Sequence, residues 1–103
     1  MYKICFFAPI EHTEKVKEAL FAAGAGKIGQ YDCCSWQTAG SGQFRALTGS
    51  QPFIGKQDKL ETVDEYKIEL VCDSEHINAA IQALKASHPY EEPAYEVYKL
   101  EKF

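Results

Sequence analysis

The chain has 103 residues, a formal net charge of −4 at pH 7, 46% hydrophobic residues and 25% charged residues. This composition is that of one ordinary globular domain, and it excludes intrinsic disorder, a collagen-like repeat and a disulfide-stapled miniprotein. We therefore treat residues 1–103 as a single domain. A chain of this size forms one thin hydrophobic core, so association with further copies would be a natural supplement.

The charge is unevenly distributed along the chain. Residues 61–103 carry 10 acidic side chains against 4 lysines, whereas residues 1–30 and 31–60 each sum to +1. No basic stripe is present, which argues against a nucleic-acid partner, because phosphate binding needs clustered Lys and Arg. The acidic last third suits a cation, a basic protein partner or a well-solvated surface.

Sequence features that report on the cellular compartment point to the cytoplasm. No apolar run approaches the roughly 20 residues that a membrane span needs, so no membrane partner is expected. The start of the chain, residues 1–7, is typical of a strand and not of a signal peptide. The four cysteines form no CxxC motif, and the neighbours Cys33 and Cys34 would point to opposite faces of any strand. We therefore expect reduced thiols in a cytoplasmic protein.

The first strand and the first helix have clear signals. Tyr2–Ala8 is rich in aromatic and β-branched residues, which predicts a strand. A helix follows. His12 or Thr13 can serve at its N-terminus, and Gly24 suits the left-handed position after its last turn. Its apolar residues recur at the spacing of one helix face: Val16, Ala19, Leu20 and Ala23.

The middle of the chain is predicted to form strands and a loop. Gln30–Gln37 and Gln43–Leu47 are predicted as two strands, joined by a glycine-bearing hairpin turn at residues 39–42. Thr48–Lys59 contains two glycines and a proline and is predicted as a surface loop. Val63–Cys72 alternates apolar and charged residues, which predicts a half-buried strand.

The last part of the chain repeats the helix-and-strand unit of the first. A second helix is predicted to start at Asp73–Ser74 and to end before His88, because a residue that precedes proline disfavours helical geometry. Tyr95–Leu100 is predicted as the final strand. The helix repeats the apolar spacing of the first one, with Ile77, Ala80, Ile81 and Leu84.

We take the order as β-α-β-β-α-β, which predicts an α+β, ferredoxin-like sandwich. In that fold a four-stranded antiparallel sheet carries both helices on one face. The other face is left open, and here it would present residues such as Phe7 and Val71 beside the charges Glu65, Lys67 and Glu69. An open face with that mixture is a candidate for contact between subunits.

The segment Gly24–Gly29 is a literal GxGxxG, the pattern of many dinucleotide-binding loops. That function requires a strand before the glycines and a helix after them, so that a helix N-terminus faces the pyrophosphate. Here a helix precedes and a strand follows, so no dinucleotide site is expected. A P-loop is excluded too, because Ile28 occupies the position where Ser or Thr must bind magnesium.

The segment His88–Pro93 is the densest polar cluster. A divalent metal could be held by nitrogen and oxygen ligands, with His88 and Glu91 as first candidates. The shell would have to be completed from outside the segment, by His12, Cys33, Glu65 or a neighbouring subunit. The structural alternative is a rigid turn, fixed by its prolines, in which Tyr90 packs and the carboxylates cap or pair.

No complete catalytic constellation is visible. A nucleophilic Cys33 or Cys34 activated by a histidine has no local sequence context that supports it. The neighbours Glu91 and Glu92 diverge in extended chain, which weakens a paired acid–base role. We therefore expect a protein that is not an enzyme and has no resident cofactor.

Four segments, taken in order, carry a family likeness: Ala23–Trp36, Gly40–Phe44, Pro52–Gly55 and His88–Tyr95. Together they resemble the YqfO-type domain, the PII/CutA-like module inserted in many proteins of the NGG-interacting-factor-three-like family. The likeness runs from Met1 to about Leu100. The larger family members hold a two-metal site in a core for which 103 residues leave no room. The metal-dependent, hydrolase-like chemistry of that core is therefore assigned to no residue of this chain.

The resemblance implies the ferredoxin-like fold and a tendency to form trimers, as PII and CutA proteins do. His88–Pro93 also looks like the His-Pro-Tyr-Glu-x-Pro segment of CutA, a trimeric protein linked to divalent cations such as copper. By that likeness His88, Tyr90 and Glu91 would lie near a cleft between subunits. Likeness of fold does not by itself confer function.

Three hypotheses follow. The first is a non-enzymatic, homotrimeric interaction or sensor module, which allows for a further protein partner. The second is a protein of CutA type that binds copper or zinc through His88 and Glu91. The third is a small-ligand sensor in which the loop that bears Lys56 closes over a cleft between subunits, as PII proteins do with nucleotides, with Tyr90 and Glu92 as further candidates for that cleft.

Overall fold

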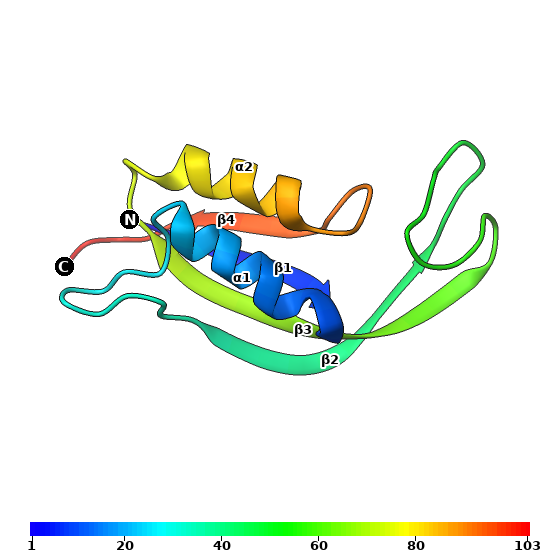
Figure 1. Ribbon diagram of the computed structural model, residues 1–103, viewed down its shortest axis with the longest axis horizontal. Coiled ribbons are helices and arrows are strands. Elements are labelled where there is room, and N and C mark those ends of the chain that lie inside the picture. Colours follow the sequence, from blue (N-terminus) through cyan, green and yellow to red (C-terminus); the bar gives the residue numbers. More distant parts are fainter.

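Four strands and two helices follow one another in the predicted β-α-β-β-α-β order, and the computed structural model describes residues 1–103. All strand pairs are antiparallel, and the strand order in the sheet is β2-β3-β1-β4. Both helices lie over the same face of the sheet (Figure 1). The predicted ferredoxin-like fold is therefore confirmed. The elements are β1 (Tyr2–Pro9), the short 3-10 helix η1 (Ile10–His12), α1 (Thr13–Ala22), β2 (Trp36–Arg45), β3 (Leu60–Cys72), α2 (Ile77–Ser87) and β4 (Tyr95–Lys99).

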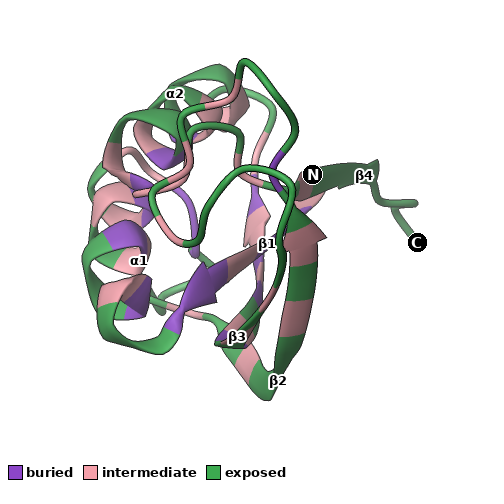
Figure 2. Cartoon of the chain, turned by 90° about the vertical axis from the view of Figure 1, so that its right-hand side faces the viewer, coloured by how far each residue is buried: buried purple, intermediate pink, exposed green.

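The hydrophobic core fills the space between the two helices and the inner face of the sheet (Figure 2). In β1 and β3 every second side chain points toward the helices. Each helix buries residues four positions apart against them. The helix spacing read from the sequence thus identifies the buried faces, although Ile77 and Ile81 are only partly buried. The core consists of Ile4, Phe6, Ala8, Val16, Leu20, Ala25, Ile68, Leu70, Cys72, Ala80 and Leu84.

The second strand differs from its prediction. The structure has one continuous strand, β2, through residues 39–42, where the sequence predicts a hairpin turn. Residues 40–42 pair in register with residues 63–65 of β3, and the chain reverses only in the loop at residues 46–59. The glycines do not make a turn here. They lie in an edge strand, and at Gly42 the side chain of Glu65 approaches the backbone closely, which is the second common use of glycine in strands. Upstream, only an isolated bridge joins Ile28 and Tyr31, so residues 30–35 are not a strand.

The long β2–β3 hairpin forms an arm that projects beyond the helices and gives the molecule its extents of 46 × 24 × 24 Å (Figure 1). The loop at its end, residues 46–59, is called the tip loop below. It bends back toward the turn that follows α2. The backbone N–H of Gln51 donates to Glu91 Oε1 at 3.0 Å, and the Phe53 ring meets the His12 ring edge-on, with centroids 5.3 Å apart. These two contacts close a space between the arm and the body of the domain.

The GxGxxG segment lies where the sequence places it, after α1 and before β2. Gly24 has a φ of +107°, which a residue with a side chain rarely adopts. A Cβ at this position would also collide with the His76 ring. The segment therefore ends one helix and lets the chain pass close to the start of α2. It does not open a helix toward a phosphate.

All four cysteines are free, and Cys5 and Cys72 are buried. Burial raises the pKa of both buried thiols, which keeps them protonated and unreactive at neutral pH. Neither helix is long and apolar enough to cross a membrane.

Replacing Gly24 by alanine tests the passage between α1 and α2. We expect Gly24→Ala to lower the free energy of unfolding by about 2–3 kcal/mol, because it adds a steric collision with His76 to the cost of the positive φ. The matched control is Gly29→Ala, where φ is +58° and a Cβ meets nothing within 4 Å. Urea denaturation measures both variants, and equal losses would show that the contact with His76 does not matter.

Candidate functional site

A large hollow lies between the arm, the tip loop and the turn at residues 88–94, and it is called the arm cavity here. Its volume is about 610 Å³, within the range of small-molecule sites. Its lining combines apolar and aromatic side chains, among which are Phe7, Phe44 and Phe53, with polar ones. The polar side chains come from β2, from the tip loop, from β3 and from the turn after His88: Thr38, Ser41, Gln43, Ser50, Glu65, Lys67, Glu91 and Glu92.

Small residues on β2 leave room for this cavity. Residues 39–42 read Ala-Gly-Ser-Gly and line it along the edge of the sheet. A Cβ at Gly40 would meet nothing within 4 Å, whereas a Cβ at Gly42 would collide with the carboxylate of Glu65. Because Gly42 has no side chain, the carboxylate of Glu65 can occupy the space where a Cβ of residue 42 would lie.

Glu65 is the one carboxylate buried in the molecule, with 9% of the residue exposed. The Tyr90 O–H donates to its Oε2 at 2.7 Å, while its Oε1 accepts no hydrogen bond from the chain and keeps contact with solvent. Burial, reinforced by the neighbouring carboxylate, raises the pKa of Tyr90 well above its usual range. The phenol thus remains a proton donor to Glu65 at any physiological pH. The pair joins the turn after α2 to the middle of β3.

His88 fixes that turn from the other side. Its Nε2–H donates to the carbonyl oxygen of Phe7 at 2.6 Å, and its Nδ1 accepts the backbone N–H of Tyr90 at 3.1 Å. These partners require the neutral ring with its proton on Nε2. Burial lowers the pKa of His88, against the opposing effect of the hydrogen bond to Phe7. Both ring nitrogens are engaged by backbone groups, so neither offers a free lone pair to a metal.

The structure does not bring the four predicted metal ligands together. Cys33 lies in the segment between α1 and β2, His12 packs against Phe53, and Glu91 accepts a backbone N–H from the tip loop. The only set of three or more potential ligands with atoms within 4.8 Å of one another is Asp73, Glu75 and His76, before α2. Binding of copper or zinc through His88, Glu91, His12 and Cys33 therefore stays a prediction, and the hydrogen bonds of His88 do not favour it.

The structure places two of the predicted cleft residues on the cavity. Tyr90 and Glu92 line it, whereas Lys56 belongs to the tip loop but is not among the lining residues. Glu65 was singled out from the sequence only as a charge on the open face and as a possible third metal ligand, not as the buried partner of Tyr90. The alternation of side chains along β3 predicts the face of the sheet on which Glu65 lies. Its burial depends on Gly42 and on the approach of a turn 25 residues further along the chain.

Removing the Tyr90 hydroxyl tests the link between the turn and β3. We expect Tyr90→Phe to lower the free energy of unfolding by about 1–2 kcal/mol, because a largely buried carboxylate loses its only donor within the chain. The matched control is Tyr98→Phe, whose hydroxyl bonds to Glu96 at the exposed edge strand. Thermal and urea denaturation should show a smaller loss for the control, and the reverse order would contradict this account of Glu65.

The acid side of the stability profile tests the neutral state of His88. Its pKa is lower in the folded chain than the ordinary value of about 6.5 in the unfolded chain, so the unfolded chain takes up a proton more readily. We expect the free energy of unfolding to be at its full value above about pH 6.5 and to fall as the pH decreases toward the folded-state pKa.

Urea denaturation between about pH 5 and pH 7.5 measures this dependence. His88→Gln should remove the decline, because the amide does not titrate. His76→Gln, at the start of α2, is the matched control and should retain it. A decline that persists unchanged in His88→Gln would contradict the assignment.

Known proteins resemble this chain over nearly its whole length. A "GTP cyclohydrolase 1 type 2 homolog" of Halalkalibacterium halodurans is 48% identical over 100 residues, which cover 97% of this chain and 27% of that protein. A crystal structure of a Bacillus cereus protein related to NIF3 superposes with a TM-score of 0.83 at 38% identity, covering 98% of this chain and 26% of the other. The divalent cation tolerance protein CutA of Archaeoglobus fulgidus superposes with a TM-score of 0.67 at 20% identity, covering 100% and 87%. No family model matches the chain.

The architecture and these likenesses define the class first: the chain is an α+β domain with the CutA-like, ferredoxin-like fold. Within that class it is a YqfO-type domain, as its identity to the homologues and to the NIF3-related structure shows. The chain spans about a quarter of the length of the curated relatives it matches.

Proposed function

We propose that this domain is a non-enzymatic sensor module that assembles as a homotrimer through the uncovered face of its sheet. The observation that carries the proposal is an exposed apolar surface on the face opposite the helices, which we call the bare face. A trimer is also what the CutA-like and PII-like resemblance implies. The activity named for the longer relatives belongs to those proteins, of which this chain matches about a quarter.

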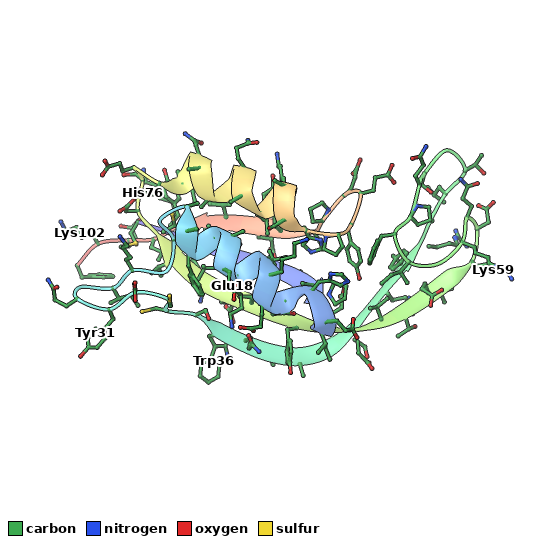
Figure 3. All side chains as sticks on the ribbon, viewed as in Figure 1. Glu18, Tyr31, Trp36, Lys59, His76 and Lys102 are labelled. Carbon is green, nitrogen blue, oxygen red and sulfur yellow. The ribbon has the colours of Figure 1, made fainter.

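The bare face carries large apolar side chains at both of its edges. Trp36 of β2 points away from the helices (Figure 3) and is 69% exposed. Tyr98 of β4 is 48% exposed. Between them, Val71 and the stem of Lys3 lie side by side on paired strands. Trp36, Lys3 and Val71 also line one shallow hollow. Large exposed aromatic rings on one face of a small domain are typical of a protein–protein interface.

Charges on the bare face suit a second copy of the same chain. Lys3 pairs with Glu69 at 3.1 Å, and Lys67 and Glu96 lie on the same face. A surface that holds both signs can meet its own copy without net repulsion. A head-to-tail contact repeats in the same direction, and where its rotation closes it forms a ring, of which a trimer is the smallest.

The environments of the histidines and thiols support a role without catalysis. His88 is bound to backbone groups through both ring nitrogens, and His76 is bound to Asp73 through its Nδ1. Cys34 donates to a backbone carbonyl oxygen. None of these bonds joins a histidine to a thiol or hydroxyl, the arrangement that activates a nucleophile.

The mass of the particle in solution tests the proposal. Light scattering and native mass spectrometry should give about three chains per particle at micromolar concentration for the unaltered chain. Trp36→Glu should shift the particle toward the monomer, because it puts a charge where an apolar ring would be buried. Its far-UV circular dichroism should be unchanged, since Trp36 is exposed and outside the core.

The matched control is Gln82→Glu, which adds the same charge on an exposed position of α2, on the opposite side of the sheet. This variant should assemble like the unaltered chain. A stable monomer of the unaltered chain, or full assembly of Trp36→Glu, would contradict the proposed interface.

A further inference from the structure

We propose that the arm cavity binds a small amphipathic cation, an amidinium, guanidinium or ammonium group on an aromatic or apolar body, with Glu65 as its anchor. The inference deepens the proposed sensor function, on which it rests for its biological meaning. The site itself is formed by residues of one chain.

The first step of the argument is the state of Glu65. Its carboxylate is buried and lines the cavity, and only one of its two oxygens is satisfied, by the Tyr90 hydroxyl at 2.7 Å. The second oxygen, Oε1, has no hydrogen-bond partner in the chain. This oxygen keeps contact with solvent, because no buried side-chain oxygen of the chain lacks a partner, and a ligand in the cavity can therefore reach it. A ligand that donates a charge-assisted hydrogen bond at this point would bind to a carboxylate that is otherwise largely removed from water.

The second step is the charge of the cavity. Three carboxylates line it, those of Glu65, Glu91 and Glu92, against a single ammonium group, that of Lys67. One of the three, Glu91, is already engaged by the N–H of Gln51. The remaining excess of negative charge repels phosphates and carboxylates and attracts cations. This balance favours a cationic ligand over an anionic nucleotide.

The third step is the apolar wall. Phe7, Phe44 and Phe53 line the cavity, and the Tyr90 ring lies 6.2 Å from that of Phe44 at an angle of 55°. Aromatic walls bury the body of a ligand, and their faces attract cations. With a volume of about 610 Å³, the cavity has room for a ring system together with its charged group.

The fourth step is the contrast between two glycines on the same face of β2. A Cβ at Gly42 would occupy the space in front of Glu65 Oε1, whereas a Cβ at Gly40 meets only open space. Neither glycine has a positive φ, so alanine fits the backbone at both positions. The chain thus supplies a pair of variants that differ in access to the anchor and in little else.

The experiment uses three probes of nearly the same shape: benzamidine, which is cationic, benzamide, which is neutral, and benzoate, which is anionic. Binding is followed by amide chemical shifts in NMR titrations up to about 10 mM, because a ligand this small binds weakly. We expect benzamidine to bind at least tenfold more tightly than benzamide, with shifts centred on residues 39–42 and 90–92. Benzoate should not bind. No shift with benzamidine, or tighter binding of benzoate, would overturn the proposal.

The variants test the anchor. Glu65→Gln and Gly42→Ala should each weaken benzamidine binding at least tenfold, and Glu65→Gln should bring benzamidine to the level of benzamide. Gly40→Ala should bind like the unaltered chain. If the dispersion of the NMR spectrum shows that Gly42→Ala is poorly folded, the result with Glu65→Gln decides whether Glu65 is the anchor. Benzamidine binding that survives Glu65→Gln unchanged would overturn the role of Glu65.

The proposed assembly and the proposed ligand site can be tested independently of each other. Titration of Trp36→Glu should show benzamidine binding even where light scattering reports a monomer, because the cavity is formed within one chain. Loss of assembly with retained binding contradicts only the trimer, and loss of binding in an intact trimer contradicts only the ligand site.

Discussion

The neutral ring of His88 holds the functional end of this domain together. It joins residues 81 positions apart in sequence, since its Nε2–H reaches the carbonyl oxygen of Phe7 at the end of β1. Its Nδ1 also orders the backbone of Tyr90, which then presents its hydroxyl to Glu65 on β3. One buried imidazole therefore fixes the turn after α2 against two central strands. Without it, the wall of the arm cavity that contains Tyr90 would be held only by the hydrogen bonds of Tyr90 to Glu65 and of Glu91 to the tip loop.

The cavity and the bare face share the strand β3. Glu65 and Lys67 line the cavity, and Glu69 and Val71 follow on the same face of that strand toward the surface proposed for assembly. This strand is hydrogen-bonded on both sides, to β2 and to β1. In the proposed sensor, a cation that binds to Glu65 therefore contacts the same strand that contributes to the interface.

Much of the fold follows from local patterns, while the site does not. The alternation in β3 and the apolar spacing at Val16 and Leu20 identify the strand and the helix face, because burial on one side imposes those periods. The prediction of a turn at residues 39–42 was wrong because glycine serves both turns and close approaches, and only the register against β3 distinguishes them. The burial of Glu65 depends on that register and on the distant Tyr90, so no local signal reveals it.

The His-Pro-Tyr-Glu segment shows why residue chemistry alone suggested a metal site. A histidine beside carboxylates has the right atoms for copper or zinc, and the segment does gather polar groups. Here each group has another partner: His88 bonds to backbone at both nitrogens, Tyr90 bonds to Glu65, and Glu91 bonds to the tip loop. The same residues thus secure the cavity wall from three sides. The oxygen left without a partner belongs to Glu65, outside the segment, and it faces a space that an organic cation fits better than a bare metal ion, because a single carboxylate oxygen offers one ligand where a metal needs at least three.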